Sequence, residues 1–274
     1  MLIDSHAHIW DPAKPGGVPF PPPESPIHRV IATADIRRHL DTCKLTAAIL
    51  VEASERHVDN LWCLEQIADC DFIPAYVANL NPMSTEFNAQ LDALTGYPKL
   101  RAIRPRLHPW EQASLAGFLP RFGRLAELGL MIENRMESAL IPLADALPTL
   151  QIVVTHCGHV DTDQSPLPPR QVELVRTLAA RKNIVFKFSG LMDLCTQKRP
   201  ATCDPDYYAA LTDLLWDELG PERLMFGSDW PVLEESERNY ADAFDLAYSL
   251  INSRGGASAI DAVFGDTAEH LYRL

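Results

Sequence analysis

Short apolar segments alternate with longer amphipathic segments along the whole chain. Eight of these segments are short and mostly apolar, as expected of parallel strands that are covered on both faces. The predicted strands cover residues 2–10, 47–51, 72–80, 100–107, 130–134, 151–155, 184–189 and 224–229. Apolar positions at helical spacing predict helices over residues 34–43, 56–69, 84–95, 115–128, 137–147, 170–181, 205–219, 239–253 and 256–273.

Each predicted strand is followed by a predicted helix. This alternation is typical of α/β proteins, and eight such units in a chain of 274 residues predict a (β/α)8 TIM barrel. A doubly wound open sheet is the alternative. The GxGxxG turn that many such sheets carry after the first strand is absent from the sequence. We therefore expect a single barrel domain over residues 1–274.

A proline-rich stretch separates the first predicted strand from the first predicted helix. It runs from Pro15 to Pro26, with Pro21, Pro22 and Pro23 at its centre, and its composition predicts extended backbone. The sequence before it is too short to fold alone, so this stretch is a loop of the domain and not a linker. Long loops in compact domains often serve as lids or binding loops.

The first and last strands carry the clearest chemical motifs. His6 and His8 are two residues apart, so both side chains leave the same face of a strand. Two imidazoles on one face can bind a metal or line a polar pocket, although a pair of structural histidines is an equal alternative. The last strand ends at Asp229. In a closed barrel the first and last strands are neighbours, which predicts that Asp229 lies beside His6 and His8.

Polar residues also follow most of the other predicted strands. The carboxyl ends of barrel strands form the active-site face, so these side chains are expected to meet there. They are Glu52, Asn79, Asn81, Arg104, Arg106, Asn134, Arg135, His156, Lys187 and Ser189, with His108 and His159 nearby. Any one of them has a simple interpretation as a strand-end residue in solvent. Their presence on nearly every strand predicts an active site.

The charge distribution narrows the choice of ligand. The net charge is −13, which argues against nucleic acid because phosphate neutralisation needs a basic surface. The expected barrel mouth nevertheless gathers Arg104, Arg106, Arg135 and Lys187. Arginine binds carboxylates through two parallel hydrogen bonds, so we expect a small anionic substrate with a carboxylate or sulfonate. The alternative is that some of these cations only neutralise acidic residues inside the barrel.

The sequence also bears on the compartment. No apolar run is long enough to span a membrane, and Met1 leads directly into a predicted strand, so we expect a cytoplasmic protein without a membrane partner. The six cysteines form no CxxC pair and are interpreted as reduced thiols. Cys157, next to His156, is either a nucleophile or, as we favour, a small buried residue. The pattern does not specify an oligomeric state, and a homodimer is one option.

Four segments together resemble the amidohydrolase superfamily. They are His6-Ala7-His8, His156-Cys157-Gly158, Lys187-Phe188-Ser189-Gly190-Leu191 and Gly227-Ser228-Asp229-Trp230-Pro231. The resemblance covers the whole chain and is closest to the lactonase branch of the amidohydrolase-2 family, which includes 2-pyrone-4,6-dicarboxylate lactonase, L-fuconolactonase and L-rhamnonolactonase types. It implies a hydrolase that opens a carboxylate-bearing lactone of a sugar acid or a dicarboxylate.

The resemblance also implies roles for the motif residues. Asp229 would take a proton from water as a general base, while His6, His8 and His156 would polarise the ring carbonyl. The cations expected to hold the substrate carboxylate are Arg104, Arg106, Arg135 and Lys187. Two modes stay open, one with a single divalent ion such as zinc and one without metal. The ligands of the ion would be His6, His8 and Asp229, with Glu52 as a further candidate.

Two departures from the superfamily pattern bear on the reaction. Metal-bound amidohydrolases usually place a carboxylated lysine or glutamate on the fourth strand and a histidine on the fifth. This chain has Arg104 and Arg106 on the fourth strand and Asn134 on the fifth. A zinc-dependent decarboxylase of an aromatic or enoic acid, which uses the fifth-strand histidine, is therefore the second choice. A non-catalytic barrel that binds an organic acid is a third possibility.

Overall fold

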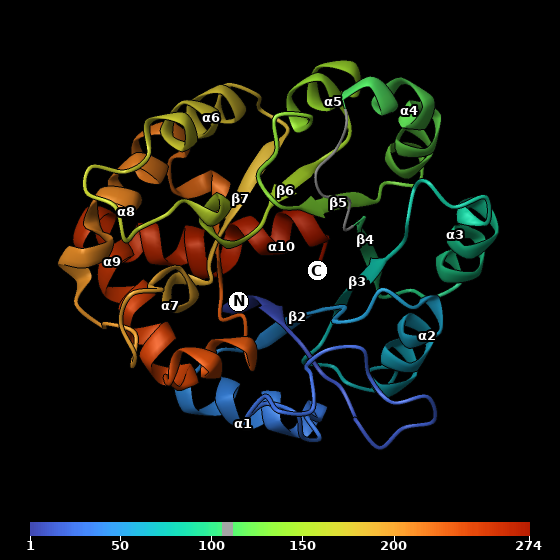
Figure 1. The fold of residues 1–274 in the computed structure, drawn as a ribbon, viewed down its shortest axis with the longest axis horizontal. Coiled ribbons are helices and arrows are strands. Elements are labelled where there is room, and N and C mark those ends of the chain that lie inside the picture. Colours follow the sequence, from blue (N-terminus) through green and yellow to red (C-terminus); the bar gives the residue numbers. More distant parts are fainter. Residues whose placement is uncertain (106–111) are drawn as a thin grey trace.

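Eight parallel strands form a barrel in which neighbours in sequence are neighbours in space (Figure 1). The computed structural model describes residues 1–105 and 112–274, so the predicted site residue Arg106 lies outside the described residues. The strands are β1 (Ile3–Ala7), β2 (Ala47–Val51), β3 (Ala75–Asn79), β4 (Leu100–Arg104), β5 (Met131–Asn134), β6 (Ile152–Val154), β7 (Ile184–Ser189) and β8 (Leu224–Gly227). The predicted (β/α)8 fold is confirmed.

Helices surround the strands on the outside of the barrel (Figure 1). They are α1 (Thr33–Cys43), α2 (His57–Gln66), α3 (Phe87–Thr95), α4 (Gln112–Glu127), α5 (Leu140–Ala146), α6 (Pro169–Ala179), α8 (Pro205–Leu219) and α9 (Tyr240–Asp261). A short helix α7 (Leu191–Leu194) follows β7, and α10 (Thr267–Tyr272) ends the chain. Short 3-10 segments η1 (His156–His159), η2 (Pro221–Arg223) and η3 (Val232–Ser236) and a π-helical segment η4 (Ala262–Asp266) complete the set.

The C-terminal helices differ in detail from the prediction. The expected boundary between the helices over residues 239–253 and 256–273 coincides with a break within α9, where Gly256 has a φ of +62°. A glycine tolerates this left-handed backbone, so the chain continues helically on both sides of the break. The short α7 was not predicted, because four residues give too little periodicity to detect.

The barrel closes between its first and last strands through Asp4. Its buried carboxylate accepts hydrogen bonds from the backbone amides of His6 and Ser228, both at 2.9 Å. It also accepts from the hydroxyls of Ser228 at 2.6 Å and Tyr240 at 2.8 Å. Just above, the amide of Asp229 donates to the carbonyl of His6 at 2.9 Å. One side chain thus joins β1 to the segment that carries Asp229, which confirms that the two strands are neighbours.

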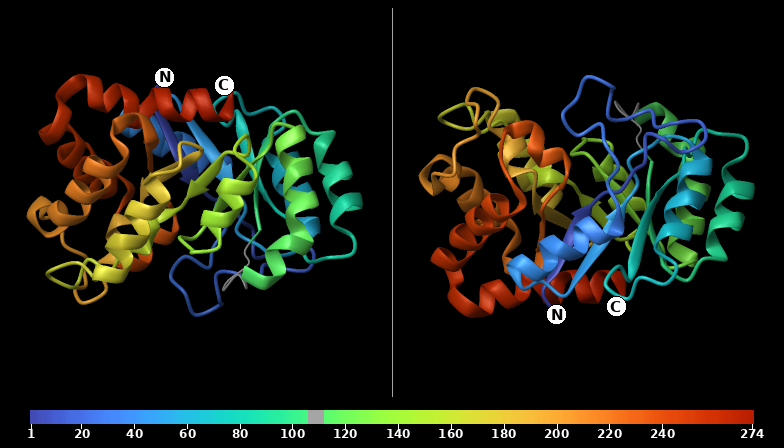
Figure 2. Two further views of the ribbon diagram at one scale, coloured as in Figure 1. Left: turned by 90° about the horizontal axis from the view of Figure 1, so that it is seen from above. Right: turned by 90° about the horizontal axis from the view of Figure 1, so that it is seen from below.

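The apolar core has two layers, as alternation along barrel strands requires. Outward-facing strand residues pack against the surrounding helices, and a smaller group fills the barrel interior. The interior group includes Ile49, Val77 and Val153 from the strands and Tyr272 from α10. Figure 2 shows α10 lying across the end of the barrel where both termini lie, with the residue 11–26 loop at the opposite end. The carboxyl ends of the strands lie toward that opposite end, where the active site of a barrel is expected.

Among the described residues, no helix combines the length and the apolar character needed to cross a lipid bilayer.

Candidate active site

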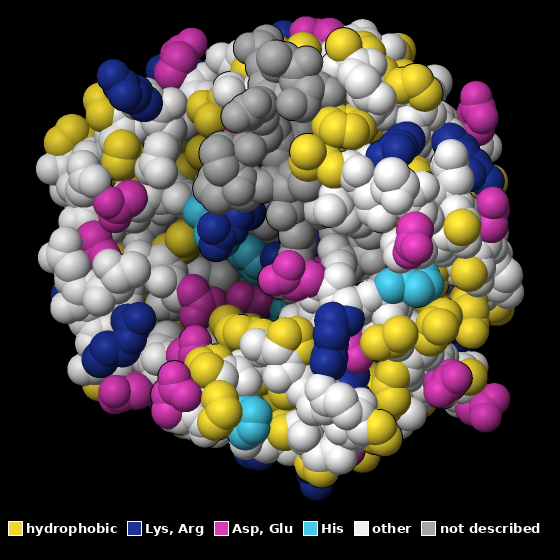
Figure 3. Space-filling view, turned by 45° about the vertical axis from the view of Figure 1, so that its right-hand side comes forward, with side chains coloured by type: hydrophobic (Ala, Val, Ile, Leu, Met, Phe, Trp, Pro, Cys, Tyr) yellow, Lys and Arg dark blue, Asp and Glu magenta, His cyan; other side chains and the backbone are white. Residues whose placement is uncertain are grey.

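A cavity of about 610 Å³ lies at the carboxyl ends of the strands. Figure 3 shows a hollow in which cationic, acidic and histidine side chains gather. The cavity is lined by His8, Phe20, Ala53, Arg104, Asn134, Arg135, His156, His159, Gly190, Asp193, Leu194, Arg199, Asp229, Val232 and Glu235. More than half of the lining residues are ionisable, which suits a polar or charged ligand.

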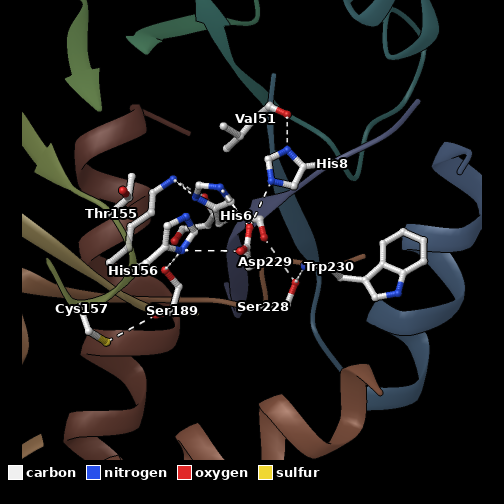
Figure 4. A network of polar contacts seen from close by, with 12 residues as sticks. His6, His8, Val51, Thr155, His156, Cys157, Ser189, Ser228, Asp229 and Trp230 are labelled. Atoms are coloured by element: carbon white, nitrogen blue, oxygen red, sulfur yellow. Dashed lines mark hydrogen bonds and ion pairs between the residues drawn. The ribbon is translucent and has the colours of Figure 1, made fainter. Parts of the chain in front are cut away.

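Asp229 is the centre of the site, and three histidines surround its carboxylate (Figure 4). Its Oδ1 atom lies 3.1 Å from Nε2 of His8 and 3.4 Å from Nε2 of His6. Its Oδ2 atom lies 3.8 Å from Nδ1 of His156. The backbone of Asp229 has a φ of +59°, a conformation that an aspartate tolerates better than most residues. This turn after β8 directs the carboxylate toward the ends of β1 and β6.

Hydrogen bonds fix the orientation of His8. Its Nδ1 atom lies 2.8 Å from the carbonyl oxygen of Val51, and a carbonyl can only accept. Nδ1 therefore carries the hydrogen, and in the neutral ring Nε2 presents a lone pair to Asp229. A lone pair and a carboxylate oxygen at 3.1 Å attract each other only if a proton or a cation is shared between them. The His8–Asp229 pair can therefore hold either a proton or a cation.

His6 is held from below by Lys187. The Lys187 ammonium group donates to the carbonyl of Ser5 at 2.6 Å, to Oε2 of Glu133 at 2.7 Å and to Nδ1 of His6 at 3.2 Å. These contacts use all three of its donors. Because Nδ1 of His6 accepts, neutral His6 carries its hydrogen on Nε2, which is directed at Asp229. A metal ion bound at Nε2 would replace that hydrogen.

His156 is placed by an unusual turn after β6. His156, Cys157, Gly158 and His159 have φ values of 51°, 52°, 71° and 54°, so four consecutive residues are left-handed. Such backbone is costly for residues other than glycine, and it often marks functional sites. The turn packs closely against Gly190, the residue directly after β7, which has no side chain. A Cβ atom at Gly190 would lie 3.0 Å from both Cβ and Nδ1 of His156.

Burial controls the ionisation of the site. Burial, together with nearby Lys187 and the neighbouring histidines, holds the pKa of His6 well below its usual range. Burial, helped by His159 and Arg104, does the same to the pKa of His156. Burial raises the pKa of Asp229 to about 7, against the opposing effect of Arg104. The two histidines are therefore neutral near neutral pH, and Asp229 exchanges a proton in that range.

The donor set fits a single metal ion. The ligand atoms of His6, His156 and Asp229 all lie within 4.8 Å of one another, and all three residues are buried. Four ligands around zinc are separated by roughly 3.3 Å from one another, given bond lengths near 2.0–2.1 Å. The 3.1 Å and 3.4 Å distances from Asp229 to His8 and His6 are of that size. Neutral imidazoles and a carboxylate are also the ligands that zinc prefers.

The family model described as Amidohydrolase matches residues 3–274. This protein belongs to the amidohydrolase family. An L-fucono-1,5-lactonase from Burkholderia ambifaria is 26% identical, over 99% of this chain and 95% of its own.

Two crystal structures resemble this amidohydrolase in fold. One is an amidohydrolase from Burkholderia multivorans with bound zinc, which has a TM-score of 0.85 and 24% identity and covers 100% of this chain and 99% of its own. The other is a putative 2-pyrone-4,6-dicarboxylic acid hydrolase from Pseudomonas putida, with a TM-score of 0.78 and 24% identity over 99% of this chain and 97% of its own.

The amidohydrolase brings most of the predicted site residues together. Asp229, His6, His8 and His156 form one group, and Arg104 and Arg135 line the same cavity. The predicted metal group changes in composition, since His156 joins His6 and Asp229 as the third mutually close residue, while His8 lies beside this group with its Nε2 atom 3.1 Å from Asp229.

Two expectations meet a different arrangement, whereas the interpretation favoured for Cys157 agrees with the structure. Lys187 is fully buried beneath His6 and does not line the cavity, which argues against direct contact with substrate. Glu52 lines a separate small cavity and is not among the mutually close metal-competent residues of the described chain. Cys157 is buried, donates to the carbonyl of Ser189, and has a pKa that burial raises to about 12, as expected of a structural thiol.

The sequence reasoning missed several residues that line the cavity. Asp193 is the most important, because its carboxyl group adjoins that of Asp229 and one of its buried oxygens lacks a hydrogen-bond partner. Burial and the nearby Asp229 and Glu235 carboxylates raise the pKa of Asp193 well above its usual range. Asp193 lies in α7, three residues beyond the glycine that ends the β7 segment, so an inspection limited to strand ends passes over it. Arg199 and Phe20 were missed for the same reason.

Proposed function

We propose that this amidohydrolase hydrolyses a small lactone derived from a sugar acid or a dicarboxylate. The observation that carries the proposal is a buried carboxylate, Asp229, that lies among three histidines in a cavity also lined by Arg104 and Arg135. The names of the similar proteins, a lactonase and a putative pyrone dicarboxylic acid hydrolase, point to the same reaction class.

The reaction follows from the position of each group. Ionised Asp229 accepts a proton from a water molecule in the cavity, and the water oxygen forms a bond to the lactone carbonyl carbon. Negative charge then develops on the carbonyl oxygen, where donor groups of the cavity stabilise it. The bond between that carbon and the ring oxygen breaks, and the proton is returned to the ring oxygen as the ring opens. The product is a hydroxy acid.

The arginines would orient the substrate. Arg104 and Arg135 line the cavity in a protein whose net charge is −13, so this local positive charge favours an anionic group. Their planar groups match the geometry of a carboxylate. A carboxylate held there keeps the lactone carbonyl at a constant place relative to Asp229, which lowers the entropic part of the barrier.

A divalent ion fits the same residues. His6, His156 and Asp229 would hold it, with His8 beside them, and zinc is the ion favoured by this donor set. When bound, such an ion lowers the pKa of a coordinated water and polarises a carbonyl. Under this mode His6, His156 and Asp229 would act as ligands, and Asp229 would keep its role as the acceptor of the proton from water.

The test combines metal analysis with a hydrolysis assay. The purified protein is analysed for bound metal, and ring opening of a panel of sugar-acid and dicarboxylate lactones is followed by acid release, before and after chelation. Hydrolysis of at least one lactone supports the proposal, and its sensitivity to chelation decides between the two modes. Bound zinc with no lactone hydrolysis and with release of carbon dioxide from an aromatic or enoic acid would replace the proposal with the decarboxylase.

A further inference from the structure

The long loop after the first strand brings one aromatic side chain into the cavity. Residues 11–32 connect Trp10 to α1, and Phe20 of this loop lines the cavity. The Phe20 ring packs edge-on against Trp10, with centroids 5.7 Å apart. Figure 2 shows the loop beyond the strands, at the end opposite to the termini. Among the described residues that line the cavity, Phe20 is thus the one phenylalanine, tyrosine or tryptophan, and most of the others are ionisable.

One arginine from outside the loop fixes its first half. Nη1 of Arg56 donates to the carbonyl of Gly16 at 2.7 Å, and Nη2 donates to the carbonyl of Gly17 at 2.5 Å. Both glycines have positive φ values, +82° and +58°, which turn these consecutive carbonyls toward the arginine. Nε of Arg56 donates to Oδ2 of Asp59 at 2.8 Å, so each of the three guanidinium nitrogens donates a hydrogen bond.

A second cation reinforces this attachment. Lys14, which unlike Arg56 belongs to the loop, donates to Oδ1 of Asp59 at 2.6 Å. Its ammonium group lies 4.5 Å from the centre of the Trp62 ring. Asp59 is buried and also accepts from the Ser54 hydroxyl. The Asp59 carboxylate therefore joins the start of α2 to the loop through two cations, in a setting where solvent screens the charges weakly.

The second half of the loop is attached to the opposite side of the mouth. Ser25 donates to Glu235 at 2.7 Å, and Arg29 donates to both oxygens of Glu234 at 2.7 and 2.9 Å. Since η3 follows β8, the loop spans from the β2 side to the β8 side. Phe20 lies between the two attachments, so contacts on both sides of it hold the loop, and of the attaching residues Glu235 alone also lines the cavity.

We propose that Phe20 contacts the substrate and that Arg56 positions it, an inference that rests on the proposed lactone hydrolysis. Phe20 packs against a non-polar C–H edge or alkyl substituent of the lactone ring, while the cationic part of the lining holds the carboxylate. Aromatic walls with a few fixed polar groups are the usual basis of small-molecule selectivity. Arg56 acts through the loop backbone, so its loss should affect the substrate only by way of Phe20.

The experiment is a double-mutant cycle on two lactones that differ by one ring methyl group. Wild type, Phe20→Ala, Arg56→Met and the double variant are compared by kcat/KM for hydrolysis, and by calorimetric binding of the corresponding non-hydrolysable lactams. Arg176→Met is the matched control, because Arg176 pairs with Glu218 at 3.0 Å on the outside of the barrel. Thermal unfolding of each variant shows whether the fold is intact.

Phe20→Ala should remove a preference for the methyl lactone of roughly tenfold, the lower end of what one methylene contributes in an apolar pocket. Arg56→Met should lower the preference for the methyl lactone several-fold, mainly through KM. It should cause no further loss of this preference in the Phe20→Ala background. Arg176→Met should leave the preference unchanged. Equal selectivity in Phe20→Ala and wild type, or additive losses in the double variant, would overturn the inference although hydrolysis itself stands. Absence of both lactone hydrolysis and lactam binding would overturn the proposed function and the inference together.

Discussion

Two buried carboxylates of the barrel, Glu133 and Asp229, have opposite kinds of surroundings. Glu133 accepts from Lys187 at 2.7 Å and from the Tyr272 hydroxyl, and all of these side chains are fully buried. Asp229 instead meets histidines at 3.1–3.8 Å, and the buried Nε2 atom of His6 beside it has no hydrogen-bond partner.

This difference in pairing indicates a structural role for Glu133 and a chemical role for Asp229. A buried polar group that is fully paired stabilises one arrangement and resists change. A buried group whose partners are incompletely matched can accept a proton, a water molecule or an ion at small cost. Both kinds occur within one barrel, and Lys187 joins them because it contacts Glu133 and His6 together.

The largest effect on activity is expected at Asp229. Asp229→Asn keeps the size of the side chain but cannot accept the proton of the attacking water. Turnover should fall by about 10²–10⁴, the usual contribution of a general base, while the lactam analogue still binds. Steady-state kinetics and calorimetry on the same preparation measure the two quantities. Near-normal turnover in this variant would remove Asp229 from the reaction.

The largest effect on stability is expected at Lys187. Lys187→Met leaves the Glu133 carboxylate buried without its cation, which typically costs about 3–5 kcal/mol of unfolding free energy. Denaturant unfolding measures this loss. The double variant Lys187→Met/Glu133→Gln should recover part of it, since the uncompensated charge is then absent. No recovery would mean that Lys187 matters through its other contacts.

The pH dependence should follow Asp229. Burial raises the pKa of this carboxyl to about 7, and only its ionised form can accept a proton. In the metal-free protein kcat/KM should therefore rise with pH, by about tenfold between pH 6 and pH 8, and then level off. An initial-rate profile in buffers of constant ionic strength measures it. A flat profile through this range would contradict the raised pKa.

The smallest effect is expected at Cys157. Cys157→Ala removes a fully buried thiol whose pKa is raised to about 12, so no reactive thiolate is lost. Turnover should stay within about twofold, and stability should fall by about 1 kcal/mol for the small void. A large loss of turnover with an intact fold would revive Cys157 as a nucleophile.

The sequence was sufficient for the barrel and for the meeting of Asp229 with His6 and His8. Few folds other than a barrel are compatible with eight strand-like apolar segments in regular alternation with helices. Closure of the barrel then brings the first and last strands together. These conclusions depend on topology, which is robust to small errors in element boundaries.

The sequence was insufficient where depth or loop conformation decides the outcome. Alternation along β7 shows that Lys187 faces inward, but not that it lies one layer below the cavity against Glu133. Asp193 and Phe20 reach the cavity from a four-residue helix and a long loop, whose paths depend on contacts distant in sequence. Such positions follow from tertiary packing and not from local pattern.

The left-handed turn at His156–His159 has a consequence for the evolution of new substrate preferences. A library of substitutions in this turn should contain few folded variants. β-Branched residues are strongly disfavoured at positive φ, and glycine or asparagine are the most tolerated replacements. The loop that carries Phe20 has no such restriction at that position. In laboratory selection for altered specificity, substitutions should therefore accumulate in the loop that carries Phe20 and be absent from the His156–His159 turn.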